Sequence, residues 1–332
     1  MISFRLSSRL LALLCFALSL STFMSGFGQQ PHQVKFRVKG ESIIVVPVMI
    51  NGAGPFDFML DTGTTNTLID RKLAEELHLP TAGKGFLATV QNEAVTPIAH
   101  ANSVSMAGAN VRGLDLFVIN HFADRPPHVR GNLGEDFLRH FDLLFDNRHH
   151  LIQFELGPGP LGDMLVGERL SLSLNGPEEK EPTENRLIIA GHCPESGSRE
   201  MKFQLDSGVS GVVLFTALNT LAVFRPPPTH TVEGPFGGSF DANSQTAHLR
   251  LGKKLFIETA LVPEGNISPR GGGVDGLLPT SLFRSIFISH SGKFVILDPS
   301  AKPAVAQSKH PSRADAEISD APSLRRPSSE SQ

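Results

Sequence analysis

An internal repeat with a constant offset of 145 residues constrains the fold of this chain more than any other feature. Three pairs of unlike residues share the offset: Asp61 with Asp206, Gly131 with Gly276, and Arg139 with Arg284. The segments that start at the two glycines, GNLGEDFLRHF and GLLPTSLFRSI, also place apolar residues at equivalent positions. One duplication explains all of these agreements, and a length of 332 residues is sufficient for two lobes with separate cores.

Each copy of the repeat places one Asp between an apolar run and a tight turn. The first copy reads FDFMLDTGTTNTLID from Phe56 to Asp70, and the second reads FQLDSGVSGVVLF from Phe203 to Phe215. A single Asp before Thr-Gly is typical of a turn in which the side chain bonds its own backbone. Recurrence at the repeat offset indicates instead that the two carboxylates act together.

The rest of the pattern predicts an all-β protein. Short apolar runs, separated by Gly, Asn and Pro, are typical of strands. We expect strands at VKFRV, SIIVVPVMI, FDFML, LDLFVI and LIQFE in the first copy, and at RLIIAGH, MKFQL, VVLF, AHLRL, LFIETALV and KFVIL in the second. The leucines of LIDRKLAEELHLP, which ends at Pro80, have near-helical spacing, so one short helix is expected after the first turn.

Composition divides the chain into five segments. In order, they are a signal peptide (1–28), a first lobe (33–157), an interlobe connection (158–184), a second lobe (185–299) and a disordered tail (300–332). The connection is rich in Pro, Gly and charge on both sides of a polar-edged strand at Arg169–Leu174. The tail is dominated by Ala, Ser, Pro and charged residues and cannot bury a core.

The N-terminus predicts export. Arg5 and Arg9 precede the apolar run LLALLCFALSL, and small residues follow up to Gly28. The run is short for a bilayer span, so we expect a secretory signal peptide and a periplasmic or secreted protein; a retained membrane anchor is the alternative. No later segment is apolar for long enough to cross a membrane. Removal of the signal leaves Cys193 as the only cysteine, which excludes an internal disulfide.

Charge and motifs exclude several classes of function. The formal net charge is −3, with 30 basic and 33 acidic residues, so neither nucleic acid nor an anionic membrane is an expected partner. The 13 His residues have no HExxH spacing and no G-x-S-x-G elbow is present. We therefore expect no metal, no other cofactor and no serine nucleophile.

The paired motifs resemble those of the aspartic peptidases, and more closely the retropepsin-like and pepsin-like group in its bacterial form. In that group an apolar strand, Asp-Thr/Ser-Gly, a short helix and a later apolar-Gly segment follow one another. Here FMLDTGTTNTLI is followed by NLGEDFL, and FQLDSGVSGVVLF by DGLLPTSLF. The resemblance covers scattered landmarks between residues 33 and 299. It implies two closed β-barrel lobes around a pseudo-twofold axis, with a central cleft and one Asp from each lobe.

The resemblance implies that Asp61 and Asp206 are catalytic residues of an aspartic endopeptidase. Two adjacent carboxyl groups cannot both ionise cheaply, so they share one proton, and the ionised member activates a water that attacks the peptide bond. The substrate would be a peptide or protein, and one chain would act as a monomer without a cofactor. Thr64 adds a hydroxyl near Asp61 where the second copy has Val209, so we expect Asp61 to be mainly the base and Asp206 mainly the acid.

Four further residues would support the two aspartates. In the family, the hydroxyl groups at the positions of Thr62 and Ser207 reach across the axis and join the two loops. Gly63 and Gly208 would let the backbone pass close to the carboxylates and point N–H groups at them.

Three departures from the family pattern affect this interpretation. Pro279 stands where the first copy has Gly134, so the backbone of the second apolar-Gly segment is expected to differ. The chain has no Tyr to serve as the flap tyrosine of pepsin-like enzymes. A flap would therefore act through its backbone, and Ala82–Val95 and Glu233–Gln245 are the candidate flaps.

Two other functions remain open. An exported peptide-binding module with the same fold and no catalysis is the main alternative, because fold does not fix function. The presence of both aspartates, both hydroxyl residues and both glycines favours the enzyme. A homodimer of retropepsin-type lobes is made unnecessary by the second DSG.

Overall fold

Strands make up most of the structure, which confirms the expected all-β character. The computed structural model describes residues 32–40, 42–88, 93–120, 128–174, 186–197, 199–215, 229–233, 239–264 and 273–302. Contacts group Met1–Ala301 into one unit, to which every strand named below belongs, and Lys302–Gln332 into another. The predicted signal peptide and all but the first three residues of the predicted tail lie outside the described residues.

The first copy contains eleven strands and two short helices among the described residues. The strands are β1 (His32–Lys35), β2 (Arg37–Lys39), β3 (Ile43–Ile50), β4 (Ala53–Leu60), β5 (Leu68–Asp70), β6 (Thr81–Ala88), β7 (Glu93–Met106), β8 (Ala109–Ile119), β9 (Gly131–Leu133), β10 (Phe141–Asp146) and β11 (Leu151–Leu156). The helices are α2 (Arg71–Glu76) and α3 (Glu135–Leu138). VKFRV was expected as one strand, but it divides at Phe36 because β1 and β2 belong to different sheets.

The remaining strands follow after Leu156. They are β12 (Leu165–Val166), β13 (Arg169–Ser173), β14 (Ile188–Gly191), β15 (Met201–Leu205), β16 (Val212–Leu214), β17 (Thr229–Glu233), β18 (Ser239–Leu251), β19 (Lys254–Pro263), β20 (Gly276–Leu278), β21 (Ser285–Ser289), β22 (Phe294–Leu297) and β23 (Ser300–Ala301). Three 3₁₀ turns accompany them: η1 (Leu161–Met164), η2 (Pro194–Ser196) and η3 (Thr280–Leu282). No helix in the part of the chain that is described is both long and apolar enough to span a membrane.

The predicted short helix is confirmed as α2. Asp70 caps it, because its carboxylate accepts a hydrogen bond from the Leu73 N–H at 3.3 Å. The helix buries Leu73 and Ala74 against the core. It is shorter than the predicted segment because Leu68–Asp70 pair with β8 as strand β5.

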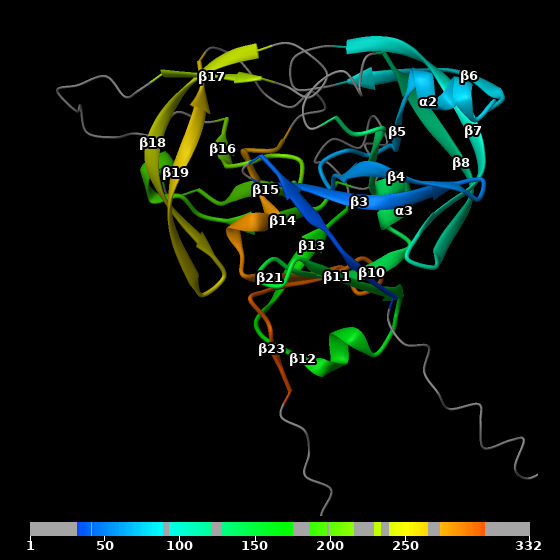
Figure 1. Ribbon diagram of the computed structural model, residues 1–332. Helices are drawn as coiled ribbons and strands as arrows, with labels where there is room; N and C mark the ends of the chain where they lie inside the picture. The colour runs from blue at the N-terminus through cyan, green and yellow to red at the C-terminus, as the bar shows by residue number, and fades with distance from the viewer. Residues whose placement is uncertain are drawn as a thin grey trace, which may run out of the picture. The chain divides into compact units, whose positions relative to one another are not determined.

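Two large sheets and one small one contain all of the strands. An eight-stranded sheet has the order β2-β3-β4-β9-β5-β8-β7-β6, with a further pairing of β3 with β7. A thirteen-stranded sheet has the order β1-β11-β10-β21-β22-β13-β14-β15-β20-β16-β19-β18-β17, and β12 pairs with β23. Figure 1 shows β6, β7 and β8 side by side in cyan to green, and β17, β18 and β19 side by side in yellow to green.

The backbone pairing follows the sequence repeat. In β4 and β9, Phe58 pairs with Gly131 in parallel, and in β15 and β20, Phe203 pairs with Gly276 in the same way. Both residues of the second pair lie one offset of 145 after those of the first. The antiparallel pairing of β5 with β9 likewise recurs in β16 with β20. The duplication predicted from the sequence is therefore present in the strand register that surrounds each Asp.

The pseudo-twofold axis of the repeat passes between β10 and β21. These strands pair antiparallel, and Leu143 lies opposite Ile288, its own equivalent at the repeat offset. In an antiparallel pair of equivalent strands, residues meet their own equivalents only at a twofold axis. The two copies thus join in one continuous sheet at this pair.

One of the predicted boundaries needs correction. Ser300–Ala301 were expected in the disordered tail, but they pair with Leu165–Val166, so ordered structure extends two residues past Pro299. The strand expected at Arg169–Leu174 in the connection is confirmed as β13, which pairs with both β22 and β14 within the large sheet. Backbone hydrogen bonds to both neighbours hold β13 in place. Composition alone does not indicate which strands pair.

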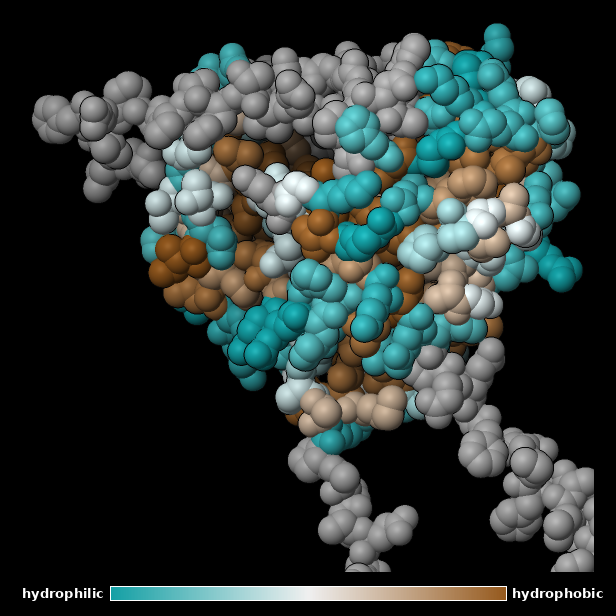
Figure 2. Space-filling view, viewed as in Figure 1, coloured by the Kyte–Doolittle hydropathy of each residue, from teal (hydrophilic) through white to brown (hydrophobic). Residues whose placement is uncertain are grey.

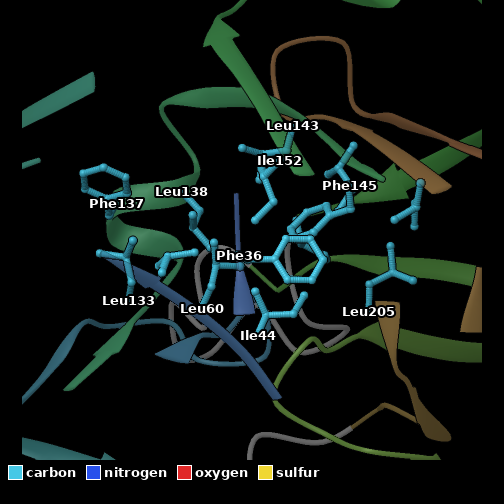
Figure 3. Packing of buried hydrophobic residues seen from close by; sticks show 14 of the residues in the cluster. Phe36, Ile44, Leu60, Leu133, Phe137, Leu138, Leu143, Phe145, Ile152 and Leu205 are labelled. Atoms are coloured by element: carbon cyan, nitrogen blue, oxygen red, sulfur yellow. The ribbon is translucent and has the colours of Figure 1, made fainter. Parts of the chain in front are cut away.

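The core extends through both copies. One cluster of buried hydrophobic residues includes Leu60 and Leu205, which directly precede the two aspartates and are fully buried. Figure 3 shows both of them in the same apolar interior, with Phe36 and Phe145 between them. Both aspartates are therefore attached to strand ends whose positions are fixed by packing. At the surface, hydrophilic residues cover most of the face in Figure 2, and hydrophobic residues emerge over β18 and β19, where Leu255 and Ile257 are exposed.

Candidate active site

Asp61 and Asp206 occupy equivalent positions at the ends of β4 and β15. The Asp61 N–H donates to the Leu133 carbonyl at 3.0 Å, and the Asp206 N–H donates to the Leu278 carbonyl at 2.9 Å. Each apolar-Gly segment therefore fixes the backbone of the Asp in its own copy. The two side chains are buried but keep some exposure, 5% for Asp61 and 9% for Asp206.

Thr62 and Ser207 join the two Asp loops by four hydrogen bonds. The Thr62 N–H donates to Ser207 Oγ and the Ser207 N–H donates to Thr62 Oγ1, both at 3.0 Å. Each hydroxyl then donates across the axis, from Thr62 to the Leu205 carbonyl at 3.0 Å and from Ser207 to the Leu60 carbonyl at 2.8 Å. Both residues are buried, so these bonds hold the two loops in a fixed relation.

Gly63 and Gly208 each lie against both carboxyl groups. The Gly63 N–H donates to Asp61 Oδ1, and the Gly208 N–H donates to Asp206 Oδ1, each at 2.8 Å. A Cβ on Gly63 would lie 2.2 Å from Asp206 Cγ, and one on Gly208 would lie 2.7 Å from Asp61 Cγ. Glycine is required because the carboxylate of the opposite copy fills the place of a side chain. The structure thus brings both carboxyl groups together with all four of these supporting residues.

Asp61 receives two further hydrogen bonds, one of which was not anticipated from the sequence. Thr64 Oγ1 donates to Asp61 Oδ2 at 2.8 Å, which places Thr64 where it was expected. Asn132, in β9, donates from Nδ2 to the same oxygen at 2.7 Å and to Thr64 Oγ1 at 3.2 Å. The signal for Asn132 was present in the repeat, because its equivalent is Leu277 in an otherwise apolar segment.

Asp206 has a less polar environment. The equivalents of Thr64 and Asn132 on this side are Val209 and Leu277. Burial raises the pKa of Asp206 well above its ordinary value, and the negative charge of Asp61 and a hydrogen bond with its side chain raise it further. The N–H groups of Gly208 and Val209 counteract only part of this increase. The arrangement therefore favours a proton on Asp206.

Helix α3 holds the loop that follows Asp61. The Glu135 N–H donates to the Thr64 carbonyl at 2.9 Å, and Asp136 accepts from the N–H and hydroxyl of Thr67 at 2.8 and 2.6 Å. A Cβ on Gly134 would lie 2.7 Å from the carbonyl of Asn66, so the helix approaches this loop closely. Burial raises the pKa of Asp136 to about 6, although the bonds from Thr67 lower it.

The second copy differs at this point, as Pro279 predicted. Pro279 lacks the N–H that Gly134 donates to Thr67 Oγ1 at 3.1 Å. Its backbone has φ −64° and ψ 139°, against −100° and −175° at Gly134, and the 3₁₀ turn η3 replaces α3. The Asp206 loop therefore lacks an equivalent of the Gly134–Thr67 hydrogen bond.

Both candidate flaps lie in hairpins. Ala82–Val95 spans the pairing of β6 with β7, in which Phe86 lies opposite Val95 with both side chains exposed. Glu233–Gln245 spans the pairing of β17 with β18. Residues 89–92 and 234–238, between the paired strands in the sequence, lie outside the described residues.

Other reactive residues lie outside this site. Cys193 is a buried free cysteine whose thiol donates to Glu195 Oε2 at 3.2 Å, and burial raises the pKa of the thiol. Within the described ranges, no three His, Cys, Asp or Glu side chains are grouped so that they could hold a metal ion.

The comparison with known families agrees with this geometry over the first copy. The model of the aspartyl protease family matches residues 46–137. The matched range contains Asp61, the loop after it, Asn132 and most of α3. The match supports an aspartic protease family for this chain and, at that level, hydrolysis of peptides. No curated protein matches the chain.

Proposed function

We propose that this protein is an aspartic endopeptidase in which Asp61 and Asp206 activate one water for attack on a peptide bond. The observation that carries the proposal is the reciprocal bonding of Thr62 and Ser207 across the pseudo-twofold axis. It places each carboxyl group against the glycine of the opposite loop. The match of residues 46–137 to the aspartyl protease family supports the same function.

The chemistry follows from the unequal surroundings of the two acids. Asp61, which accepts three hydrogen bonds from groups of its own copy, takes a proton from the bound water. Asp206, whose pKa is raised, donates a hydrogen bond to the carbonyl of the scissile bond. The tetrahedral intermediate collapses when Asp61 gives the proton that it took from water to the leaving nitrogen and the C–N bond breaks, which leaves Asp61 ionised and the single proton of the dyad on Asp206. These steps require no metal ion and no covalent intermediate.

The substrate and the biological setting belong to the same proposal. A peptide or protein chain is the substrate, and the hairpins β6–β7 and β17–β18 are the proposed flaps. One chain supplies both aspartates, so a monomer is sufficient for activity. We further propose that the protein acts after export, in the periplasm or outside the cell, and the N-terminal apolar run is the basis for this.

A cleavage assay tests the proposal against its main alternative, an inactive peptide-binding module. Purified mature protein is incubated with a mixture of random peptides, and new termini are identified by mass spectrometry between pH 3 and pH 7. Cleavage should be inhibited by a peptide in which a hydroxyl-bearing carbon replaces the scissile carbonyl. Peptide binding without cleavage at any of these pH values would instead identify the binding module.

A further inference from the structure

Asn132 contacts Asp61 and has no polar counterpart beside Asp206. It is fully buried in β9, and its Nδ2 lies 2.7 Å from Asp61 Oδ2. Its equivalent in β20 is Leu277, which is also buried. The registers of β9 and β20 against their neighbouring strands are equivalent. At this position the two copies therefore differ in the side chain and not in the backbone register.

Asn132 also fixes the direction of the Thr64 hydroxyl. An amide nitrogen only donates, so Thr64 Oγ1 accepts from Asn132 Nδ2 at 3.2 Å. The single O–H of Thr64 is then directed at Asp61 Oδ2, 2.8 Å away. A hydroxyl without such a donor could rotate and accept a hydrogen bond instead. Both donors therefore act on the same oxygen of Asp61.

The orientation of the amide fits an ionised Asp61. Asn132 Oδ1 is buried and has no hydrogen-bond partner among the described residues. Turning the amide would direct this oxygen at a carboxylate oxygen and replace an attraction with a repulsion. In the observed orientation Oδ1 has no partner, but Nδ2 donates to Asp61. The donated bond outweighs the unpartnered oxygen when Asp61 carries the charge, because hydrogen bonds to charged groups are stronger.

The charged groups around Asp61 make these donors necessary. Among the described residues, Asp206 from the opposite loop and Glu135 from α3 each interact with its charge. Both are acids, so whenever either is ionised it opposes a negative charge on Asp61. Hydrogen bonds from Gly63, Thr64 and Asn132 are the described contacts that favour that charge. The Gly63 bond has an equivalent at Asp206, where the Gly208 N–H donates in the same way. The bonds from Thr64 and Asn132 are therefore the ones that distinguish the two aspartates.

We propose that Asn132 is a positioning residue that keeps Asp61 ionised, directly and through Thr64, and thereby makes Asp61 the base and Asp206 the acid. This inference rests on the proposed function, because the two roles are those of an aspartic endopeptidase. It adds a residue that acts on the reaction without touching the substrate. It also explains why an amide stands in a segment whose equivalent is apolar.

Exchange of the two equivalent residues tests the proposal in the enzyme assay. Asn132→Leu gives the first copy the residue of the second, and the acidic limb of kcat/KM should move to higher pH by about one unit, since the ionised dyad loses a donor. The matched variant Leu277→Asn should move the limb to lower pH. The double exchange should return it toward the wild-type position. An unmoved limb in Asn132→Leu would overturn the proposal.

A titration that needs no turnover separates this proposal from the proposed function. Aspartate side chains are labelled with ¹³C, and the signals of the two residues are assigned with Asp61→Asn and Asp206→Asn. On acidification of the wild type, Asp206 should gain its proton first and Asp61 last, and Asn132→Leu should reduce the separation. If this order is found without peptide cleavage, the proposed function fails and the assignment of charge holds. If Asp61 gains its proton first, the role of Asn132 is refuted, even in an active enzyme.

A second variant covers the case in which Asn132→Leu does not fold. Thr64→Val removes the other donor and leaves the amide in place, so the limb should again move to higher pH, by less than one unit. A Thr64→Val enzyme with the wild-type profile, together with a wild-type titration in which Asp61 is protonated first, would overturn the proposal without Asn132→Leu.

Discussion

His290, in the turn after β21, lies 2.9 Å from Glu135 of α3 in a buried pair that joins the second copy of the repeat to the first. The other ring nitrogen, Nδ1, lies 2.6 Å from the Phe141 carbonyl, which can only accept, so Nδ1 carries a hydrogen. The N–H of Glu135 in turn holds the Thr64 carbonyl. The Asp61 loop is therefore fixed from the second copy through Ser207, through His290 and through Gln204, whose amide donates to the Gly63 carbonyl at 3.0 Å.

This pair predicts a pH-dependent loss of stability in His290→Phe, which introduces the residue found at the equivalent position, Phe145. Loss of the imidazole leaves Glu135 buried without its partner, at a cost of roughly 3 kcal/mol in the free energy of unfolding near neutral pH. Burial raises the pKa of Glu135 above 4.5, so the folded protein binds its proton more tightly than the unfolded chain does. The loss should therefore be small near pH 4 and grow as the pH rises.

Chemical denaturation at several pH values measures this effect. Glu135→Gln is the matched control, because its amide can donate to a neutral His290 and keeps the contact without a charge. It should lose less than His290→Phe near neutral pH. Equal losses in the two variants at every pH would show that the pair contributes only packing.

Asp136 predicts a second pH dependence, in the wild type itself. The pKa of this carboxyl is raised from 3.8 to about 6, chiefly by burial. Because the folded protein binds this proton more tightly than the unfolded chain does, the protein is most stable, as far as Asp136 is concerned, below about pH 4. The free energy of unfolding should then fall by up to about 3 kcal/mol as the pH rises through 6. Asp136→Asn should flatten that decrease in denaturation experiments between pH 4 and pH 7.

Asp298 supplies the control of opposite sign. Burial raises its pKa, but the hydrogen bond and charge of Lys254 and the N–H groups of Ser285 and Arg284 lower it overall. Its stabilisation is therefore present above the ordinary pKa of 3.8 and is lost as the pH falls. Asp298→Asn should not change the decrease in the free energy of unfolding that Asp136 is expected to cause between pH 4 and pH 6. If Asp136→Asn also leaves it in place, the decrease has another source.

The two aspartates should act as a unit. Asp61→Asn and Asp206→Asn should each reduce peptide hydrolysis by roughly 10³-fold or more and keep the fold, because one shared water needs both carboxyl groups. Circular dichroism and the denaturation midpoint establish that the fold is retained. Near-normal turnover in either single variant would exclude a shared water.

Thr62 and Ser207 should be energetically coupled. Thr62→Val and Ser207→Ala each remove hydrogen bonds that cross the axis, at a cost of about 1–3 kcal/mol in the free energy of unfolding. The double variant should lose less than the sum, by about 1 kcal/mol, since both remove the same contacts. Thr65→Val is the control, because among the described residues the Thr65 hydroxyl bonds to the adjacent Asn66, at 3.2 Å, and not across the axis. Additive losses would mean that the four bonds act independently.

The two ends of the chain can be tested by processing and truncation. We expect the mature protein to begin shortly after Gly28, which N-terminal sequencing of exported protein would establish. Removal of residues 303–332 should leave activity and stability unchanged, as their composition indicates. Removal from Ser300 onward also deletes β23, which pairs with β12, and should lower the stability. A large loss in the shorter truncation would contradict the expected disorder.

The sequence by itself determined the features that repeat or that depend on neighbouring residues. The constant offset predicted the duplication that is seen in the pairing of Phe58 with Gly131 and of Phe203 with Gly276. Apolar runs predicted the strands, and the leucine spacing that ends at Pro80 predicted α2. These features are legible because a strand or a helix turn is specified within a few residues of chain.

The tertiary structure alone decided which polar groups meet. Asn132 bonds to Asp61 across 71 residues of chain, and His290 bonds to Glu135 across 155. Each glycine is required by the carboxylate of the opposite copy, which local sequence does not contain. A buried polar side chain takes its partner from whatever the fold places beside it, and pKa values depend on burial and on nearby charge. The environments of Asp61 and Asp206 therefore differ partly through Asn132 of β9 and Leu277 of β20, which only the fold places beside them.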